Sequence, residues 1–306
     1  MENHSETQSK PAVVVATFSR EMNLRLVTGE IVRARIKGKK LKPVCGDRVQ
    51  AAPIENEPQW LISAIDKRDN ELARPNMRGQ IEILAANLDY LCVVAANTPA
   101  VDWFIVDRYL CAAELMNIDA AVVYNKAELD SDPRPTIAAL KVYEKIGYST
   151  VQCSAKNRQN IDQLGRLLAG KTSIIVGQSG VGKSSIINIL SSEPDQKTRE
   201  VSAGTGEGRH TTVNSVMLDI ADGGKVIDSP GVRDYAPATQ TNAQVATSFR
   251  EIKTLSYDCR FANCQHLQEP NCAVKEGIDS GAISKRRYDS YRRLIVLSEQ
   301  LAKKRI

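Results

Sequence analysis

The spacing of apolar residues changes along the chain and divides it into three parts. Between Ala12 and Arg74, short runs rich in β-branched residues are separated by turn residues, and no stretch has a good helical period. Roughly five short strands within about sixty residues are typical of a small closed barrel, such as an oligonucleotide-binding (OB) fold. The stretch 71–80, with Pro75 and Gly79, predicts a linker that leaves this barrel.

The middle of the chain, from about residue 81 to 238, has a different pattern of apolar residues. Near-continuous runs of Val, Ile and Leu, such as 88–96 and 172–176, alternate with stretches of helical period, such as 103–117. Strands that are apolar throughout are usually buried on both faces. The pattern therefore predicts an α/β domain whose parallel sheet is covered on both sides by helices.

Beyond this domain the strand signals stop. Residues 239–256 and 284–306 have helical periods, and a cluster of cysteines and a histidine lies between them. We therefore expect a multidomain chain with a barrel over residues 1–75, an α/β domain over 76–240 and an α-helical domain over 241–306.

Composition supports a globular chain in the cytoplasm. The 306 residues are 42% hydrophobic and 25% charged, which argues against disorder. No apolar run is long enough to cross a membrane, and the first ten residues lack the apolar core of a signal peptide, so we expect no membrane contact. A monomer is expected.

Four scattered cysteines are expected to be reduced core residues, namely Cys45, Cys92, Cys111 and Cys153.

Two basic regions indicate a polyanionic partner, most simply RNA. Residues 285–306 carry eight Lys or Arg and two acidic residues, whereas the net charge of the whole chain is only +5. The stretch 33–48 of the predicted barrel adds seven basic residues. On charge alone, the basic helix is equally consistent with a solvated helix face, and the barrel charges with a role in solubility.

A phosphate-binding loop is the clearest chemical motif. GQSGVGKS at 177–184 fits G-x-x-x-x-G-K-[ST] and lies between a predicted strand and a predicted helix. Its backbone N–H groups would face phosphate oxygens, Lys183 would reach the β- and γ-phosphates, and Ser184 would ligate Mg²⁺. The expected phosphate-binding residues are Gly177, Gln178, Ser179, Gly180, Val181, Gly182, Lys183, Ser184 and Ser185.

A second phosphate-side motif follows, KVIDSPG at 225–231. Asp228 at the end of an apolar strand could hold Mg²⁺ through a water molecule, and the amide of Gly231 could contact a γ-phosphate. A Gly-rich loop precedes this strand, and either Thr211 or Thr212 is a candidate metal ligand in it.

Two motifs upstream of the phosphate loop indicate a guanine base. In NKAE, Glu128 would accept both N–H groups of the guanine edge, Asn125 would fix the loop and Lys126 would cover the base. In CSAK, the backbone N–H groups of Ser154 and Ala155 would face the guanine O6, and Lys156 would pack on the ring.

The order of these motifs, base before phosphate, suggests a circularly permuted GTPase domain. A parallel sheet places its ligand loops at the carboxyl ends of the strands, so such a permutation preserves the site. With GRHTT at 208–212, DSPG at 228–231 and the cysteine pattern described below, nearly the whole chain resembles the RsgA (YjeQ) family. The resemblance implies GTP hydrolysis stimulated by the small ribosomal subunit, contact of the barrel and the zinc domain with rRNA, and a role late in subunit maturation.

The chain differs from the pattern of that family in two places. Glu128 stands where Asp is usual, and Val213 occupies the third place of a threonine run.

Val232 follows Gly231, where Ras-like enzymes have a Gln that orients the attacking water. His210, one of three histidines, is therefore the best candidate for positioning that water, although it could instead be an exposed loop histidine.

The last motif is a metal-binding pattern. C-x4-C-x-H-x5-C gives three thiolates and one imidazole, a complete tetrahedral set for one structural zinc ion with no open position. The expected ligands are Cys259, Cys264, His266 and Cys272. Redox-active cysteines are the alternative.

Three functions fit these motifs to different extents. The first is a Mg²⁺-dependent GTPase switch that binds the small ribosomal subunit. The second is an rRNA-binding assembly scaffold that uses GTP as a structural ligand. The third, an ATPase, is disfavoured by the NKAE and SAK motifs.

Overall fold

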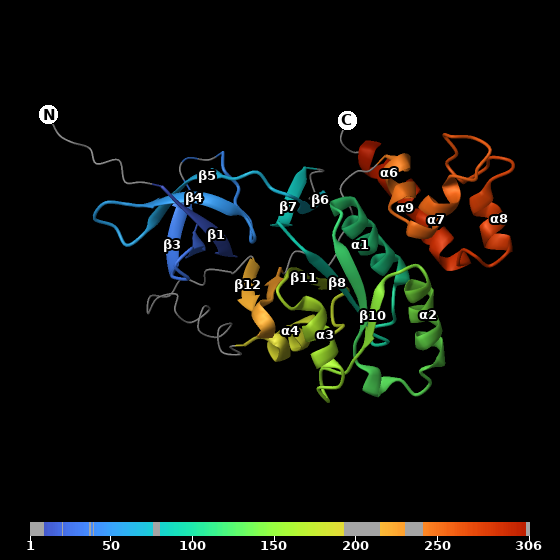
Figure 1. Ribbon diagram of the computed structural model, residues 1–306, viewed down its shortest axis with the longest axis horizontal. Coiled ribbons are helices and arrows are strands. Elements are labelled where there is room, and N and C mark those ends of the chain that lie inside the picture. Colours follow the sequence, from blue (N-terminus) through green and yellow to red (C-terminus); the bar gives the residue numbers. More distant parts are fainter. Residues whose placement is uncertain are drawn as a thin grey trace.

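The computed structural model has a barrel at one end of an elongated molecule, a helical domain at the other end and a central sheet between them (Figure 1). It describes residues 9–19, 21–36, 38, 40–75, 80–192, 215–229 and 241–303. None of the helices within these ranges combines the length and the apolar character needed to span a bilayer.

The predicted five-stranded barrel is confirmed. Its strands are β1 (Lys10–Thr17), β2 (Met22–Leu26), β3 (Ile31–Ile36), β4 (Arg48–Pro53) and β5 (Trp60–Ile65). The ring closes in the order β1-β2-β3-β5-β4 and back to β1, with β3 and β5 parallel and the other pairs antiparallel. Alternate residues point inward, and Val14, Leu24 and Ile62 are fully buried in the barrel core.

The predicted linker after the barrel is wrong. Residues 71–75 form strand β6 (Glu71–Pro75), which pairs antiparallel with β7 (Ile81–Ala86). Leu72 is buried in the core of the central domain. The run is too short and too polar to read as a strand by itself, and its partner strand supplies the hydrogen bonds that define it.

The parallel sheet of the central domain is confirmed, with one exception. Its order is β10-β9-β8-β11-β13-β12, and the first five strands are parallel. They are β8 (Tyr90–Ala95), β9 (Asp119–Tyr124), β10 (Ser149–Gln152), β11 (Thr172–Gly177) and β13 (Lys225–Asp228). Strand β12 (Ser215–Asp219) runs antiparallel to β13, because the two form a hairpin.

Helices cover both faces of this sheet. One core contains residues of α1 (Trp103–Met116) and α2 (Arg134–Lys145), and the other contains residues of α3 (Ile161–Leu168) and α4 (Lys183–Leu190). Alternate residues along β8 enter the two cores in turn, as expected for a strand buried on both faces. The four scattered cysteines are buried and free, which confirms their assignment to the core.

The barrel continues the central sheet. β1 pairs antiparallel with β12, so that one eleven-stranded sheet passes through both domains. Arg25 of β2 forms two hydrogen bonds with the carboxylate of Asp219, at 2.8 and 2.6 Å. The barrel is thus hydrogen-bonded to the hairpin that leads to Asp228.

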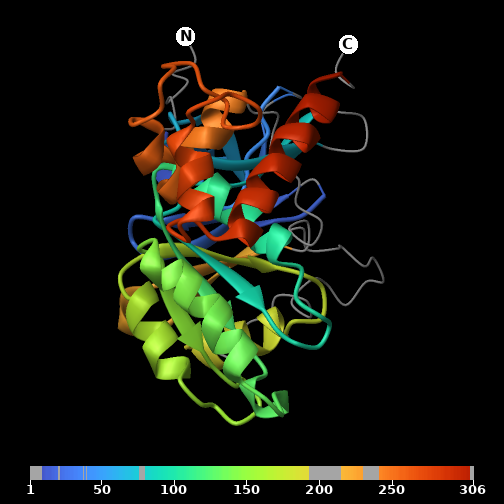
Figure 2. The same cartoon turned by 90° about the vertical axis from the view of Figure 1, so that its right-hand side faces the viewer.

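The C-terminal domain is helical, as predicted, and contains α6 (Asn242–Thr247), α7 (Arg250–Ser256), α8 (Ala273–Asp279) and α9 (Lys285–Lys303). It packs on α1 and its neighbours (Figure 2). Arg250 of α7 donates to Glu114 of α1 at 2.7 Å, and its guanidinium lies 4.0 Å from the ring centroid of Tyr148.

The charge of α9 is partly internal. Arg287 is 1% exposed, and it donates to Asp107 of α1 at 2.7 Å and to Glu251 of α7 at 2.7 and 3.1 Å. Arg286 contacts Asp107 and the hydroxyl of Tyr143 in α2. Of the basic residues that suggested a polyanionic partner or a solvated helix face, Arg287 is therefore available to neither.

Candidate nucleotide site and metal centre

The predicted phosphate loop joins β11 to α4. Gly177 has a φ of 133°, and a Cβ at this position would lie 2.1 Å from the carbonyl oxygen of Val94, so only glycine fits. Lys183, the first residue of α4, donates from Nζ to the carbonyl oxygens of Gly177 and Gln178, both at 2.7 Å. The loop and its lysine thus form one compact unit at the N-terminus of a helix, where the helix dipole favours anions.

This loop lines a cavity of about 250 Å³ together with the end of β13. The lining residues are Ser179, Gly180, Gly182, Lys183, Ser184, Ser185, Asp228 and Ser229. The ammonium of Lys183, the hydroxyl of Ser184 and the carboxylate of Asp228 therefore border one space. A lysine, a hydroxyl and a carboxylate around a loop of backbone N–H groups suit a phosphate chain and a hard divalent cation.

Asn125 links the predicted base and phosphate loops. Its Nδ2 donates to the carbonyl oxygen of Val181 in the phosphate loop at 2.9 Å. Its Oδ1 accepts from the backbone N–H of Ala155 in the CSAK loop at 3.0 Å. Asn125 is 1% exposed and follows β9 directly. One buried amide thus joins the loops that follow β9, β10 and β11.

Lys126 adds a second link. Its Nζ donates to the carbonyl oxygen of Gly180 at 2.7 Å and to that of Thr98 at 2.8 Å. Residue 126 has a φ of 64°, a left-handed conformation that turns the chain into the short 3₁₀ helix Ala127–Leu129. This turn holds Lys126 against the phosphate loop.

Glu128 offers an acceptor for a base. Its Oε2 is shielded from solvent and has no hydrogen-bond partner within the described ranges. The Ser154 hydroxyl beside it, a backbone hydrogen bond at Glu128 and then the charges of Lys156 and Lys126 outweigh burial and lower the pKa of this carboxyl below its ordinary value, so it is ionised at neutral pH. A shielded carboxylate oxygen needs a donor. The N–H edge of guanine supplies two, whereas the corresponding edge of adenine does not.

Four predicted site residues lie outside the described ranges, namely His210, Thr211, Thr212 and Gly231. The sequence interpretation missed two residues that border the site. Ser229 lines the phosphate cavity and bonds to the hydroxyl of Ser215 at 3.0 Å, and the carbonyl oxygen of Thr98 anchors Lys126. The DSPG motif contains Ser229, whereas Thr98 contributes only its backbone and leaves no signal in the sequence.

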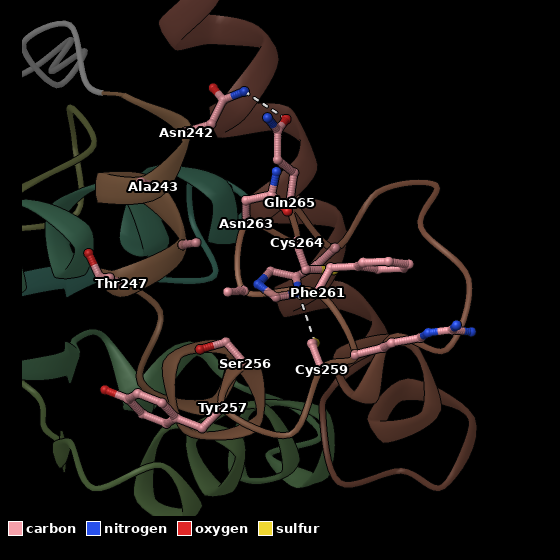
Figure 3. A pocket seen from close by; sticks show the side chains of 14 residues that line it. Asn242, Ala243, Thr247, Ser256, Tyr257, Cys259, Phe261, Asn263, Cys264 and Gln265 are labelled. Atoms are coloured by element: carbon pink, nitrogen blue, oxygen red, sulfur yellow. Dashed lines mark hydrogen bonds between the residues drawn. The ribbon is translucent and has the colours of Figure 1, made fainter.

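The predicted metal ligands come together. One donor atom from each of Cys259, Cys264, His266 and Cys272 lies within 4.8 Å of all the others. The Sγ atoms of Cys259 and Cys272 are 3.8 Å apart, and each lies 3.5 Å from His266 Nδ1; Figure 3 shows the contact of Cys259. Tetrahedral zinc with bonds of about 2.3 Å to sulfur and about 2.0 Å to nitrogen requires a sulfur–sulfur separation of about 3.8 Å and a sulfur–nitrogen separation of about 3.5 Å. The donor set therefore fits one zinc ion.

The surroundings of this cluster hold the loop in shape. Glu269, missed in the sequence, accepts from the backbone N–H groups of Gln265, Leu267 and Gln268 at 2.8, 2.9 and 3.0 Å. Burial acts to raise the pKa of Glu269, but these hydrogen bonds outweigh it and lower the pKa to about 2. The hydroxyl of Tyr288 donates to the carbonyl oxygen of His266 at 2.6 Å. Polar groups of α9 and the loop thus fix the backbone that carries the ligands.

Comparisons with known sequences agree with this geometry. A sequence model of the RsgA GTPase family matches residues 65–237. The protein called small ribosomal subunit biogenesis GTPase RsgA from Mannheimia succiniciproducens is 37% identical, with 95% of this chain and 84% of that protein covered. The protein of the same name from Histophilus somni is 38% identical, with 94% and 83% covered.

Two solved structures resemble the whole molecule. YjeQ from Thermotoga maritima has a TM-score of 0.74 at 29% identity and covers 94% of this chain and 98% of its own. YloQ, described as a circularly permuted GTPase, has a TM-score of 0.73 at 25% identity and covers 98% of both chains. A family model that matches more than half of the chain and relatives of 37% and 38% identity over almost its full length show that this chain belongs to the RsgA GTPase family.

Proposed function

We propose that this chain is a GTPase that binds the small ribosomal subunit late in its maturation and hydrolyses GTP to GDP and phosphate when bound there. The observation that carries the proposal is the position of Asn125, which joins the two base loops to the phosphate loop through hydrogen bonds of 2.9 and 3.0 Å. A base and a triphosphate of one nucleotide can therefore be held at the same edge of the sheet.

The phosphate side is assigned to the loop 177–185 and to Asp228. Backbone N–H groups of the loop bind phosphate oxygens, and Lys183 places its ammonium on the β- and γ-phosphates. Mg²⁺, held by Ser184 and Asp228 when GTP is bound, would neutralise negative charge on the phosphate oxygens. Both residues border the same cavity.

The base side is assigned to the loops after β9 and β10. Glu128 accepts the two N–H groups of guanine, and Lys126 packs over the ring from its anchor on Gly180. The backbone N–H groups of Ser154 and Ala155 donate to the carbonyl oxygen of Gln159 and to Asn125 Oδ1, so a contact of either with O6 requires the base to share or replace that partner. Lys156 completes the pocket. Glu128 offers a carboxylate to the N–H edge that distinguishes guanine from adenine, so GTP is favoured over ATP.

The hydrolytic step is assigned to His210, which would position the attacking water. Thr211 or Thr212 would contact the cation, and the Gly231 amide would contact the γ-phosphate. These roles rest on the motifs GRHTT and DSPG alone. His210→Ala should leave GTP affinity unchanged and reduce the turnover stimulated by small subunits.

The metal centre is assigned to one structural zinc ion. Three thiolates and one imidazole leave no position for water, so the ion would supply folding energy and no catalysis. Burial lowers the pKa of His266, which favours the neutral imidazole that a metal requires.

The partner is proposed from the names of the relatives and from the two outer domains. An OB-type barrel and a zinc domain at opposite ends of the molecule provide two separated surfaces for rRNA (Figure 1). We place the protein in the cytoplasm as a monomer, with domains over 1–75, 76–240 and 241–306.

A turnover assay tests the proposal. Phosphate release from GTP is measured with purified protein alone, with small ribosomal subunits and with large subunits as the control. A switch requires strong acceleration by small subunits only. Equal rates in all three reactions would instead favour the alternative, an rRNA-binding scaffold that uses GTP as a structural ligand.

A further inference from the structure

The serine of the DSPG motif, Ser229, borders the phosphate cavity but has no role in the proposed scheme of nucleotide binding. It follows Asp228 directly, lines the cavity and is 6% exposed. Its hydroxyl lies 3.0 Å from the hydroxyl of Ser215, which is also 6% exposed. Two buried hydroxyls at this distance form a hydrogen bond that is shielded from water. The pair therefore fixes the chain immediately after Asp228.

Ser215 is the first residue of β12, and the barrel holds this strand from the other side. Thr17 of the barrel strand β1 is paired with Ser215, and Ala16 is paired with Val216. Val216 in turn lies opposite Asp228 of β13. In the sheet, β12 alone separates the barrel from β13, and Figure 1 shows it beside β1. The barrel therefore helps to set the position of Ser215.

The barrel side of this contact is closely packed. Ala16 is fully buried in the core that also contains residues of α3 and α4, and Val216 and Val226 belong to the same core. Val15 and Met217 enter the core on the other face of the sheet. Closely packed cores resist small displacements. Ser215 is thus a fixed support for Ser229.

The end of β13 faces the part of a nucleotide that distinguishes GTP from GDP. In the proposed function, the phosphate loop and the two base loops mainly contact groups that both nucleotides share. Asp228 is assigned to the cation that bridges the β- and γ-phosphates, and the DSPG motif leads from it to the γ-phosphate. The contact between Ser215 and Ser229 therefore supports the γ-phosphate side of the site.

We propose that Ser215 is a positioning residue for the γ-phosphate side of the nucleotide site. Its hydroxyl holds Ser229, and with it the adjacent Asp228, in the place that a triphosphate and its cation require. The proposal rests on the proposed function, which assigns Asp228 and gives Ser215 no role.

The affinities of two nucleotides test the proposal. The Kd values of GDP and of guanylyl imidodiphosphate, a GTP analogue that resists hydrolysis, are measured by calorimetric titration of the full-length chain in Mg²⁺. Ser215→Ala should weaken binding of the analogue about three- to tenfold, because the Ser229 hydroxyl loses this hydrogen bond while it stays buried. The Kd for GDP should stay nearly unchanged. A general loss of folding would instead weaken both nucleotides equally.

Two further variants distinguish positioning from a general effect on packing. Ser215→Thr keeps the hydroxyl in a strand, where β-branched residues are favoured, and should retain most of the affinity for the analogue. Ser173→Ala removes another buried serine hydroxyl, from β11, where Ser173 is paired with Val226 of β13. That hydroxyl has no hydrogen-bond partner in the part of the chain that the structure describes. This control should therefore leave both Kd values unchanged.

Magnesium provides a second measurement. Asp228 is the proposed cation ligand next to Ser229, so a displaced chain should hold the cation less well. The Mg²⁺ concentration that gives half-maximal binding of the analogue should rise in Ser215→Ala and stay the same in Ser173→Ala. An unchanged midpoint in Ser215→Ala would show that Ser215 does not act through Asp228.

Two other results would overturn the proposal: an unchanged ratio of the two Kd values in Ser215→Ala, or the same change of this ratio in Ser173→Ala. Both are independent of the turnover assay. If small subunits fail to accelerate GTP hydrolysis, the proposed function falls, whereas the two Kd values still decide the role of Ser215.

Discussion

A single buried side-chain amide, that of Asn125, holds two loops of the candidate nucleotide site together. Asn125 is 1% exposed and satisfies its side-chain oxygen and nitrogen on two different loops. A buried amide left without partners costs about 1–3 kcal/mol, so this residue favours the arrangement in which both loops lie against it. Asn125 therefore positions its neighbour Glu128 relative to the phosphate loop.

Glu128→Gln should weaken GTP binding on the order of a hundredfold, because the variant loses two charge-assisted hydrogen bonds. Xanthosine triphosphate has a carbonyl where guanine has its amino group, so it should bind the variant better than the unchanged protein. Glu128→Asp keeps the carboxylate and should stay within about tenfold of the original GTP affinity. Fluorescent-nucleotide titration measures each Kd, and unaltered GTP affinity in Glu128→Gln would refute the assignment.

The pH dependence of GTP affinity follows from the same carboxyl. The folded-state pKa of Glu128 is lowered from 4.5, mainly by the Ser154 hydroxyl. The group is therefore ionised throughout neutral pH, and its contribution is lost only as the pH falls through the lowered pKa. GTP affinity should be flat around neutrality and should decline in acid, which titrations at several pH values can follow.

At the scale of loops and helices, glycines set how closely the site can pack. Gly182 has a φ of 93°, and a Cβ there would lie 2.3 Å from Asn125 Nδ2. The phosphate loop and the NKAE loop can thus touch only because Gly182 has no side chain. Gly223, the last residue of the short 3₁₀ helix Ala221–Gly223, has a similar φ of 73°, and a Cβ there would meet nothing within 4 Å.

Substituting these two glycines distinguishes the effect of backbone strain from the effect of a steric clash with Asn125. Gly182→Ala should lower GTP affinity at least about tenfold, because the new methyl displaces Asn125 and with it the base loop. Gly223→Ala carries similar backbone strain, roughly 1–2 kcal/mol, and should leave GTP affinity unchanged. Calorimetric titration of both variants with GTP tests the comparison, and equal affinities would show that the loops do not depend on this contact.

The cysteine loop is the element whose proposed zinc ion can be tested most directly. It has few apolar residues of its own, and its ligands lie beside the core that α6, α7 and α9 share. Metal analysis should find one zinc ion per chain, and Cys264→Ser should lose it. Chelation should lower the melting temperature and expose the loop to protease. Cys92→Ser, which alters a buried cysteine in the central sheet, should keep the zinc; zinc retained by Cys264→Ser would contradict the site.

The sequence predicted the parts of the molecule better than the connections between them. Strand and helix periods and the GQSGVGKS, NKAE and CSAK motifs are local, so the barrel, the sheet and the candidate site could be inferred from them. The pairing of β1 with β12 joins residues two hundred positions apart, such as Ala16 and Val216, and no local pattern encodes it. The role of Arg287 was hidden for the same reason, since its carboxylate partners lie in other elements.

At the scale of the whole molecule, the helical domain is fixed to the central domain by a buried ionic cluster. Arg287, Asp107 and Glu251 come from α9, α1 and α7, and their side chains are 1%, 0% and 6% exposed. Burial alone lowers the pKa of Arg287, but the two carboxylates outweigh it and raise the pKa well above its ordinary value. Arg287 therefore stays charged, and the three side chains depend on one another through its hydrogen bonds.

Arg287→Ala should destabilise this junction by about 3–5 kcal/mol, because two buried carboxylates lose their counter-charge. Arg292→Ala removes an exposed arginine from the same helix and should change stability by less than about 0.5 kcal/mol. Hydrogen exchange should show lost protection in α1 and α7 of the first variant while the barrel strands stay protected. The cysteine cluster of the helical domain and the nucleotide site of the central domain lie on opposite sides of this junction, so Arg287→Ala should also reduce the acceleration of GTP hydrolysis by small subunits more than it reduces GTP affinity. Full acceleration in a variant whose junction has loosened would show that the two domains act independently.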